Sequence, residues 1–177
     1  MYRWLICFFL CILFTSCRKQ ALKDSKGYYR ILGYGYPDTD ATKARVAIAD
    51  YWKIKYDAVA ECMVDQKLVD SVNTMNEATY AVLEQEYGKN WKERYDKDIR
   101  NFPLTSATIM DILITSRMFR KQLDKYCIKI DNVNKMVRML KDNIYEVTIY
   151  NEELKANNER CFTVQVDTGS RTVNLIK

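Results

Sequence analysis

The sequence predicts a single α+β domain with an N-terminal β-α-β unit, central helices and a C-terminal antiparallel β-meander. Short runs of branched and aromatic residues flank a segment with helical spacing near the start of the chain. The most regular helical periodicity comes next, and runs of alternating apolar and polar residues close the chain. After an N-terminal leader, about 150 residues remain, which suits one core and is too few for two comfortable domains.

The β-α-β unit is predicted over residues 28–60. Residues 28–34 (YYRILGY) favour a strand, which the turn residues GYPD at 35–38 end. Apolar residues then recur at helical spacing over residues 40–53, and residues 54–60 (IKYDAVA) form a second apolar run. A strand, a helix and a strand in succession indicate a right-handed crossover and a parallel pair.

Helices are predicted through the middle of the chain. One apolar helical face runs from Leu68 to Leu83 and ends near Gly88, a residue type that often terminates helices. A second helix is expected over residues 90–101, where oppositely charged residues stand four apart. After Pro103, residues 106–125 favour a helix, although residues 108–115 (TIMDILIT) would also suit a strand.

The last part of the chain is predicted to be mainly β. We expect a short strand over residues 127–130 and a helix over residues 131–143, capped by Asp131. Three strands then follow at residues 144–150, 161–167 and 171–176, with a turn at 168–170 and a long polar loop at 151–160.

The first seventeen residues have the layout of a signal peptide. One basic residue precedes eleven apolar residues, Trp4–Phe14. That length fits a signal-peptide core and is too short to span a bilayer, which takes about 20 residues. The small residues Thr15 and Ser16 then stand directly before Cys17.

This stretch, LFTSC at residues 13–17, resembles the lipobox of bacterial lipoproteins. The resemblance implies that Cys17 receives a diacylglycerol thioether, becomes the new N-terminus and is N-acylated. It further implies a signal peptide at 1–16, a lipidated cysteine and flexible tether at 17–27, and a domain at 28–177. The expected location is the cell envelope, anchored by lipid to the outer membrane and facing the periplasm. An ordinary secretory signal or a buried strand are the alternatives.

A second resemblance covers residues 28–101. The arrangement GYGYPD, AVAECMVDQKLVDSVN and LEQEYGKNWKE is similar to small lipoproteins of unassigned function that carry the FEKKY domain. The sequence LEQEY at residues 83–87 stands where the motif of that family would fall. The family supplies no catalytic residue to carry over.

Composition excludes several kinds of site. The chain has no histidine, which excludes Ser-His and Cys-His nucleophile pairs and zinc sites that use histidine. Without residues 1–16 the net charge falls from +5 to +4, and the acids are interspersed with the bases, so we expect no nucleic-acid partner. No cofactor is expected, because Asp38 replaces the third glycine of the dinucleotide fingerprint that residues 33–38 would otherwise resemble, and it would repel a pyrophosphate. No metal is expected either, because the remaining cysteines lack the CxxC spacing of a thiolate zinc site.

Three cysteines remain beyond Cys17, namely Cys62, Cys127 and Cys161. An oxidising envelope permits one disulfide among them. The preferred pair is Cys127 with Cys161, because each lies on the polar side of a predicted strand. Three unpaired thiols that pack as small hydrophobic side chains are the alternative.

Four acids are predicted to gather at one edge of the parallel pair. Asp38 and Asp40 follow the first strand, while Glu61 and Asp65 follow the second. With Tyr36 beside them, they would suit a cation or a basic peptide at the carboxyl edge of the sheet. The alternative is that Asp40 and Asp65 cap helices and that Asp38 and Glu61 are solvated.

Together these features favour a lipid-anchored, non-catalytic binding module whose partners are the membrane, through the lipid, and an envelope protein or component. A carboxylate-dependent envelope hydrolase that uses two of the four edge acids is the alternative. An enzyme is the less favoured of the two, because the sequence contains no concentrated catalytic motif.

Overall fold

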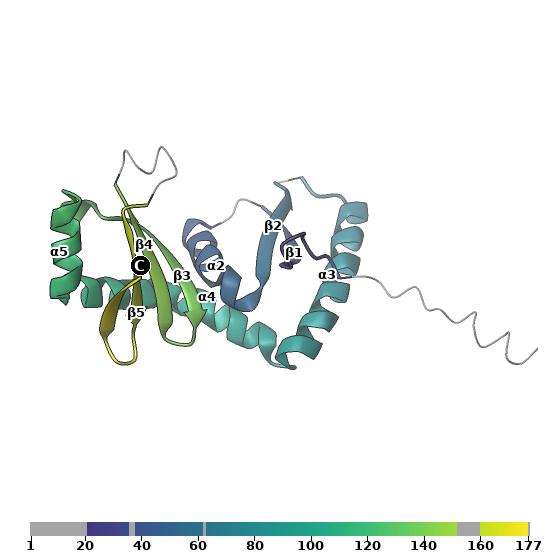
Figure 1. Ribbon diagram of the computed structural model, residues 1–177. Helices are drawn as coiled ribbons and strands as arrows, with labels where there is room; N and C mark the ends of the chain where they lie inside the picture. The colour runs from purple at the N-terminus through teal and green to yellow at the C-terminus, as the bar shows by residue number, and fades with distance from the viewer. Residues whose placement is uncertain (1–20, 36–37, 62, 152–159, 177) are drawn as a thin grey trace, which may run out of the picture.

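The computed structural model describes residues 21–35, 38–61, 63–151 and 160–176, and it has the predicted α+β architecture. A parallel two-stranded sheet and an antiparallel four-stranded sheet lie apart from each other, with helices between them, beneath them and on their outer sides (Figure 1). In chain order the elements are β1 (Tyr29–Tyr34), α2 (Thr39–Trp52), β2 (Ile54–Ala60), α3 (Gln66–Tyr87), α4 (Trp91–Thr115), α5 (Arg117–Lys125), a 3-10 turn (Ile130–Asn132), β3 (Asn134–Lys141), β4 (Ile144–Tyr150), β5 (Phe162–Asp167) and β6 (Thr172–Ile176).

The predicted β-α-β unit is confirmed. Strands β1 and β2 pair in parallel, from Tyr29 opposite Ile54 to Gly33 opposite Ala58, and α2 makes the connection between them. Parallel neighbours cannot be joined by a tight hairpin, so a helix must cross one face of the pair. Helix α2 ends at Trp52, and the next residue, Lys53, has a left-handed φ of 51° that turns the chain directly into β2.

The outer edge of β1 is closed by α3 and by the residues that precede the strand. Asn76 in α3 is buried, and its side-chain oxygen accepts from the Leu32 N–H at 2.9 Å while its side-chain nitrogen donates to the Leu32 carbonyl at 2.8 Å. Arg30 N–H also donates to the Leu22 carbonyl at 2.8 Å. A side-chain amide therefore takes the place of a neighbouring strand.

The expected tether is shorter than predicted from the sequence. Residues 21–27 were placed in it because they are polar, but Leu22 N–H donates to the Thr79 hydroxyl at 3.3 Å and Asp24 N–H donates to the Tyr28 carbonyl at 2.9 Å. Asp24 also pairs with Lys55 at 2.8 Å. Backbone pairing with β1 holds most of this segment, and only the Ala21 side chain packs against the hydrophobic core, so the largely polar composition did not reveal it.

Helix α4 runs beneath both sheets and joins two parts of the core (Figure 1). Near its start, the Tyr95 ring meets the Trp52 ring of α2 edge to face at 5.8 Å, and Trp91 packs on the Tyr95 ring. Near its end, Leu113 is fully buried. The expected interruption at Pro103 is wrong, because packing on both sides of the proline keeps the helix continuous despite one missing N–H.

The helix predicted over residues 106–125 is helical but divided at Ser116, whose ψ of 118° is extended. Its hydroxyl caps α5 by accepting from Phe119 N–H at 3.3 Å. The strand expected over residues 127–130 is wrong, since Cys127 has a φ of 54° within a turn and a 3-10 turn follows. That reversal returns the chain from α5 to the sheet.

The four-stranded sheet has the order β3-β4-β5-β6 and contains the predicted meander. The helix expected over residues 131–143 is wrong, because β3 occupies residues 134–141 and pairs with β4. Asp142 and Asn143 form a two-residue hairpin turn with Asn143 at a φ of 62°, which favours two adjacent antiparallel strands. The hairpin then selects strand over helix for the residues before it.

Helix α2 also packs along β3, which is an edge strand of the larger sheet. Tyr51 in α2 donates to the Asp142 carboxylate at 2.8 Å, at the turn that follows β3. One helix therefore covers a face of the small sheet and an edge of the large one, and it fixes their relative positions.

We expect Asn76→Ala to lower the free energy of unfolding by about 2 to 4 kcal/mol, because two hydrogen bonds are lost and the buried N–H and carbonyl of Leu32 are left unpaired. Chemical denaturation measures this effect. The matched control is Asn73→Ala, an exposed position of the same helix, which should change stability by no more than about 0.5 kcal/mol. Equal effects of the two substitutions would contradict the proposed closure of β1.

Candidate functional site

Two of the four acids predicted to gather at the carboxyl edge of the parallel pair cap helices instead. Asp38 accepts from Asp40 N–H at 3.0 Å, and Asp65 accepts from Leu68 N–H at 2.7 Å. Asp40 pairs with Lys43 at 3.5 Å, and Glu61 also has an interaction partner. In the described part of the chain, no three cysteine or acidic side chains are placed to hold a metal ion. Tyr36 lies outside the described residues.

The cap of α2 is Asp38 rather than Asp40, which the alternative interpretation of these acids named, while the cap that the same interpretation named at Asp65 is observed. A capping carboxylate is committed to backbone N–H groups and is less free to bind a ligand. These acids therefore do not form the candidate site.

Cys127 and Cys161 are free thiols in the structure, so the preferred disulfide is not formed there. Cys127 is exposed in the turn after α5, whereas Cys161 is buried at the start of β5. The pairing assumed that Cys127 lies on a strand beside the sheet, which it does not. Cys62 lies outside the described residues.

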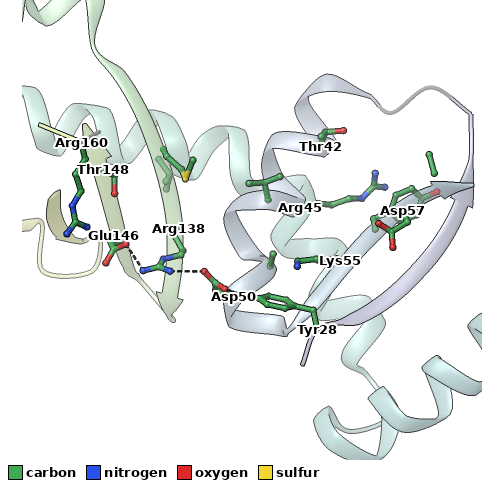
Figure 2. Close-up of a pocket in the computed structure, with 16 residues that line it drawn as sticks. Tyr28, Thr42, Arg45, Asp50, Lys55, Asp57, Arg138, Glu146, Thr148 and Arg160 are labelled. Carbon is green, nitrogen blue, oxygen red and sulfur yellow. Dashed lines mark hydrogen bonds and ion pairs between the residues drawn. The ribbon is translucent and has the colours of Figure 1, made fainter. Parts of the chain in front are cut away.

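A groove of about 670 Å³ crosses α2 between β2 and the pair β3–β4, and Figure 2 shows its two walls. This volume lies within the range of small-ligand and short-peptide sites. The lining residues are Tyr28, Thr42, Arg45, Val46, Ala49, Asp50, Lys55, Tyr56, Asp57, Ala58, Met136, Val137, Arg138, Glu146, Thr148 and Arg160. Helix α2 forms the floor, so the helix that connects the two sheets also forms the site.

Part of this groove is apolar and open to solvent. Val46 on the floor and Met136 on the sheet wall are 59% and 53% exposed, respectively. Ala49 and Val137 extend the apolar surface between them. Exposed apolar area of this kind, rimmed by polar groups, is typical of binding surfaces.

Arg138 links the sheet wall to the floor. Its guanidinium donates to Asp50 of α2 at 3.0 Å and to Glu146 of β4 at 2.6 Å, as the dashed lines in Figure 2 show. Tyr28 donates to the other oxygen of Asp50. Burial would raise the pKa of Asp50, but the Tyr28 hydrogen bond and Arg138 outweigh it, so the pKa lies below its usual value. Asp50 is therefore ionised at neutral pH.

Two other charged residues that line the groove are also paired. Asp57 pairs with Arg30, and Lys55 pairs with Asp24 at 2.8 Å. Arg45, in contrast, has no carboxylate partner among the residues that the structure describes, and its guanidinium lies 4.2 Å from the centre of the Tyr56 ring. The groove therefore keeps an unneutralised, half-buried cation.

The Tyr56 ring, on which Arg45 packs, is itself held in position because it lies over Gly33. A Cβ atom at residue 33 would overlap the Tyr56 hydroxyl, so only glycine fits there. The sequence interpretation of the GYGYPD stretch as a turn holds for Gly35, whose φ is 83°. Gly33 instead leaves space for the Tyr56 side chain. Beside Arg45, the Thr42 hydroxyl oxygen is buried and has no hydrogen-bond partner within the described residues. Arg45 and Thr42 together can receive an anionic group.

The sequence did not point to this groove. It combines residues of α2 with residues of β3 and β4 that lie some ninety positions later in the chain, such as Asp50 and Arg138. Because residues 131–143 were expected to be helical, nothing placed Arg138 next to α2. The Asp142-Asn143 pair was the available signal, since it would have predicted the hairpin and an exposed Arg138 on its outer strand.

A second cavity of about 430 Å³ contains Asp98 and Asp142. Burial raises the pKa of Asp98, even though Trp52 donates its indole N–H to this carboxylate at 2.9 Å. A buried tryptophan needs an acceptor for its N–H, which gives Asp98 a structural role.

No protein-family model matches the chain, and no curated protein or solved structure matches it either. The resemblance to FEKKY-domain lipoproteins stays a prediction. Within the described ranges, no helix is long and apolar enough to span a membrane.

We expect Arg138→Gln to raise the pKa of Asp50, because a neighbouring positive charge favours the ionised carboxylate. The folded-state pKa lies below the unfolded value of 3.8, so Asp50 stabilises the fold above about pH 4, and this contribution is lost as pH falls through the folded-state pKa. In the variant this acid-side dependence should weaken. Carboxyl NMR titration measures the pKa of Asp50 directly.

The loss of stability at neutral pH should be about 1 kcal/mol, since solvent screens a pair in which Arg138 is 45% exposed. Arg171→Gln provides the control, because it removes an ion pair with Asp111 on an exposed surface away from the groove. An Asp50 pKa that stays the same in Arg138→Gln would show that Arg138 does not link α2 to the sheet.

Proposed function

We propose that this chain is a lipid-anchored protein of the bacterial cell envelope that binds a partner in the groove over α2 without converting it. The stretch LFTSC, which ends in Cys17, supports the anchor. One acyl chain gives only marginal membrane residence, whereas two or more anchor a protein stably. The triple acylation implied for Cys17 would hold the domain at the membrane permanently.

A short connection supports a domain held close to the bilayer. The fold includes Leu22, which bonds to Arg30 and to Thr79. The four steps from Cys17 to residue 21 reach at most about 14 Å, even when fully extended. The N-terminal end with α3 would thus face the membrane, and the four-stranded sheet at the other end of Figure 1 would project away from it.

The observation that supports the binding function is that, among the described residues, an unpaired cation lies next to exposed apolar side chains in the groove. Arg45 keeps its charge without a carboxylate partner in the described structure, next to the open apolar side chains of Val46 and Met136. A ligand with both an anionic and an apolar part would satisfy both features. Such complementarity provides specificity as well as burial.

The groove is better suited to binding than to catalysis. Two of its three lining carboxylates, Asp50 and Glu146, accept from Arg138, and Asp57 pairs with Arg30. General acid-base chemistry by two carboxylates needs one that holds a proton near neutral pH and one that does not, and an arginine between them opposes this. The alternative of a hydrolase that uses the edge acids is also less favoured, because Asp38 and Asp65 cap helices and are committed to backbone N–H groups.

The anchor and the groove can be tested together in growing cells. The chain would carry a photoreactive residue in place of Val46, and the cells would receive a clickable palmitate analogue. We expect the chain to be labelled by the fatty acid and to form a covalent adduct in the envelope fraction after illumination. The adduct should be lost on Arg45→Gln, because the partner needs that cation.

Two controls separate the parts of the proposal. Cys17→Ser should abolish the fatty-acid label and release the chain from membranes. The same photoreactive residue in place of Leu104, which is 74% exposed on α4 outside the groove, should give no adduct. An unlabelled parent chain would overturn the anchor, and equal adducts from both positions would overturn the groove.

A further inference from the structure

The groove exposes the free edge of β2. Four consecutive residues, Lys55 to Ala58, all line it. Successive side chains of a strand point to opposite faces, so a cavity that meets four in a row lies along the edge of the strand. In Figure 2, β2 forms the wall opposite β3 and β4, and its labelled residues Lys55 and Asp57 lie along that wall.

The register of the parallel pair identifies the backbone groups at this edge. Tyr29 N–H donates to the Lys53 carbonyl at 2.7 Å. In a parallel ladder, alternate residues of a strand bond to the same neighbour, so Lys55 and Asp57 also direct their backbone groups toward β1. The N–H and carbonyl groups of Tyr56 and Ala58 therefore point away from β1.

The same alternation is visible on β1, where it can be checked. Arg30 and Leu32 direct their backbone groups outward, and both are paired, with Leu22 and with Asn76 respectively. The outward groups of Tyr56 and Ala58 have no partner among the described residues. One edge of the small sheet is therefore closed and the other is open, into a groove.

We propose that β2 binds an extended peptide as an added strand, and that this peptide carries an acidic residue that pairs with Arg45. The inference rests on the proposed binding function and names its partner class. Peptides that extend a sheet gain affinity from backbone hydrogen bonds and specificity from alternate side chains. Tyr56 and Ala58 supply two donors and two acceptors at the spacing of a strand.

Helix α2, the floor of the groove, determines which side chains the peptide should carry. The Tyr56 ring lies beside Arg45, so the face of β2 that bears Tyr56 is turned toward α2. A peptide residue on this face would meet Arg45 and the unpartnered Thr42 hydroxyl, and one two positions away would meet Val46. The expected motif is an acidic residue and an apolar residue separated by one position.

The test uses the full-length chain in detergent and a random library of ten-residue peptides displayed on phage. We expect selected peptides to share the acidic and apolar pair. The key variant is Ala58→Pro, which removes an N–H that the small sheet does not use and is tolerated on edge strands. It should weaken the selected peptides at least about tenfold, whereas Ala58→Ser, which keeps the N–H, should change binding less than about threefold.

Two further comparisons do not depend on how well Ala58→Pro folds. On the unmodified protein, N-methylation of alternate peptide residues should abolish binding, and methylation of the residues between them should not. Arg45→Gln should weaken the acidic peptides about tenfold. Arg100→Gln, which removes an exposed arginine of α4 outside the groove, should leave their affinity unchanged.

Three results would overturn the inference. The first is a selection that enriches no peptide, and the second is one that enriches peptides indifferent to Ala58→Pro and to N-methylation. The third is a parent chain that sediments as a dimer and that Ala58→Pro converts to a monomer, which would mean that a second copy occupies the edge. In each case a groove-specific adduct from residue 46 in cells would leave the proposed binding function standing, so the two failures are distinguishable.

Discussion

Two parallel strands that follow one another in the chain cannot be joined by a tight turn, and this constraint organises the molecule. Helix α2 makes the required crossover and covers one face of β1 and β2. Its other side packs along β3, so the position of the four-stranded sheet depends on the same helix. The groove follows from this packing. The two sheets diverge above α2, so the side of the helix that lies between them is exposed to solvent and forms the floor of the groove.

Some strand edges of the two sheets are covered by other parts of the chain, whereas, in the described structure, the edge of β2 is open. Unpaired strand edges are sites of unwanted association, and proteins usually cover or charge them. Asn76 and the segment before β1 close one edge of the small sheet, while α2 covers β3. The edge of β2 is left open, inside a groove that limits access to a segment of suitable shape and charge. An edge protected by its surroundings rather than by pairing fits a recognition role.

Local sequence was sufficient where neighbouring residues decide the structure. The β-α-β unit, the long helix ending at Gly88 and the final meander follow from spacing and turn residues, and all are observed. Local sequence was not sufficient where contacts between distant residues decide the secondary structure. Residues 134–141 have a pattern that suits both helix and strand, and the pairing with β4 selects the strand. Pro103 looked like a boundary, but packing of Tyr95 and Leu113 on either side carries α4 through it.

The candidate site was less predictable than the fold for the same reason. The sequence drew attention to acids at a sheet edge, and two of them proved to be helix caps. The residues that form the groove are ordinary when read singly. Arg45 becomes unusual only because the groove carboxylates Asp50 and Asp57 pair with other arginines and leave it without a carboxylate partner in the described structure. Which charges remain unpaired is a property of the tertiary structure.

The most direct test of this account is amide hydrogen exchange of the free full-length chain, resolved residue by residue along β2. If one edge of β2 is paired and the other faces the groove, Lys55 and Asp57 should be strongly protected while Tyr56 and Ala58 exchange much faster. Uniform protection of all four amides would contradict the account, because it would mean that the edge is already occupied or that the groove is closed.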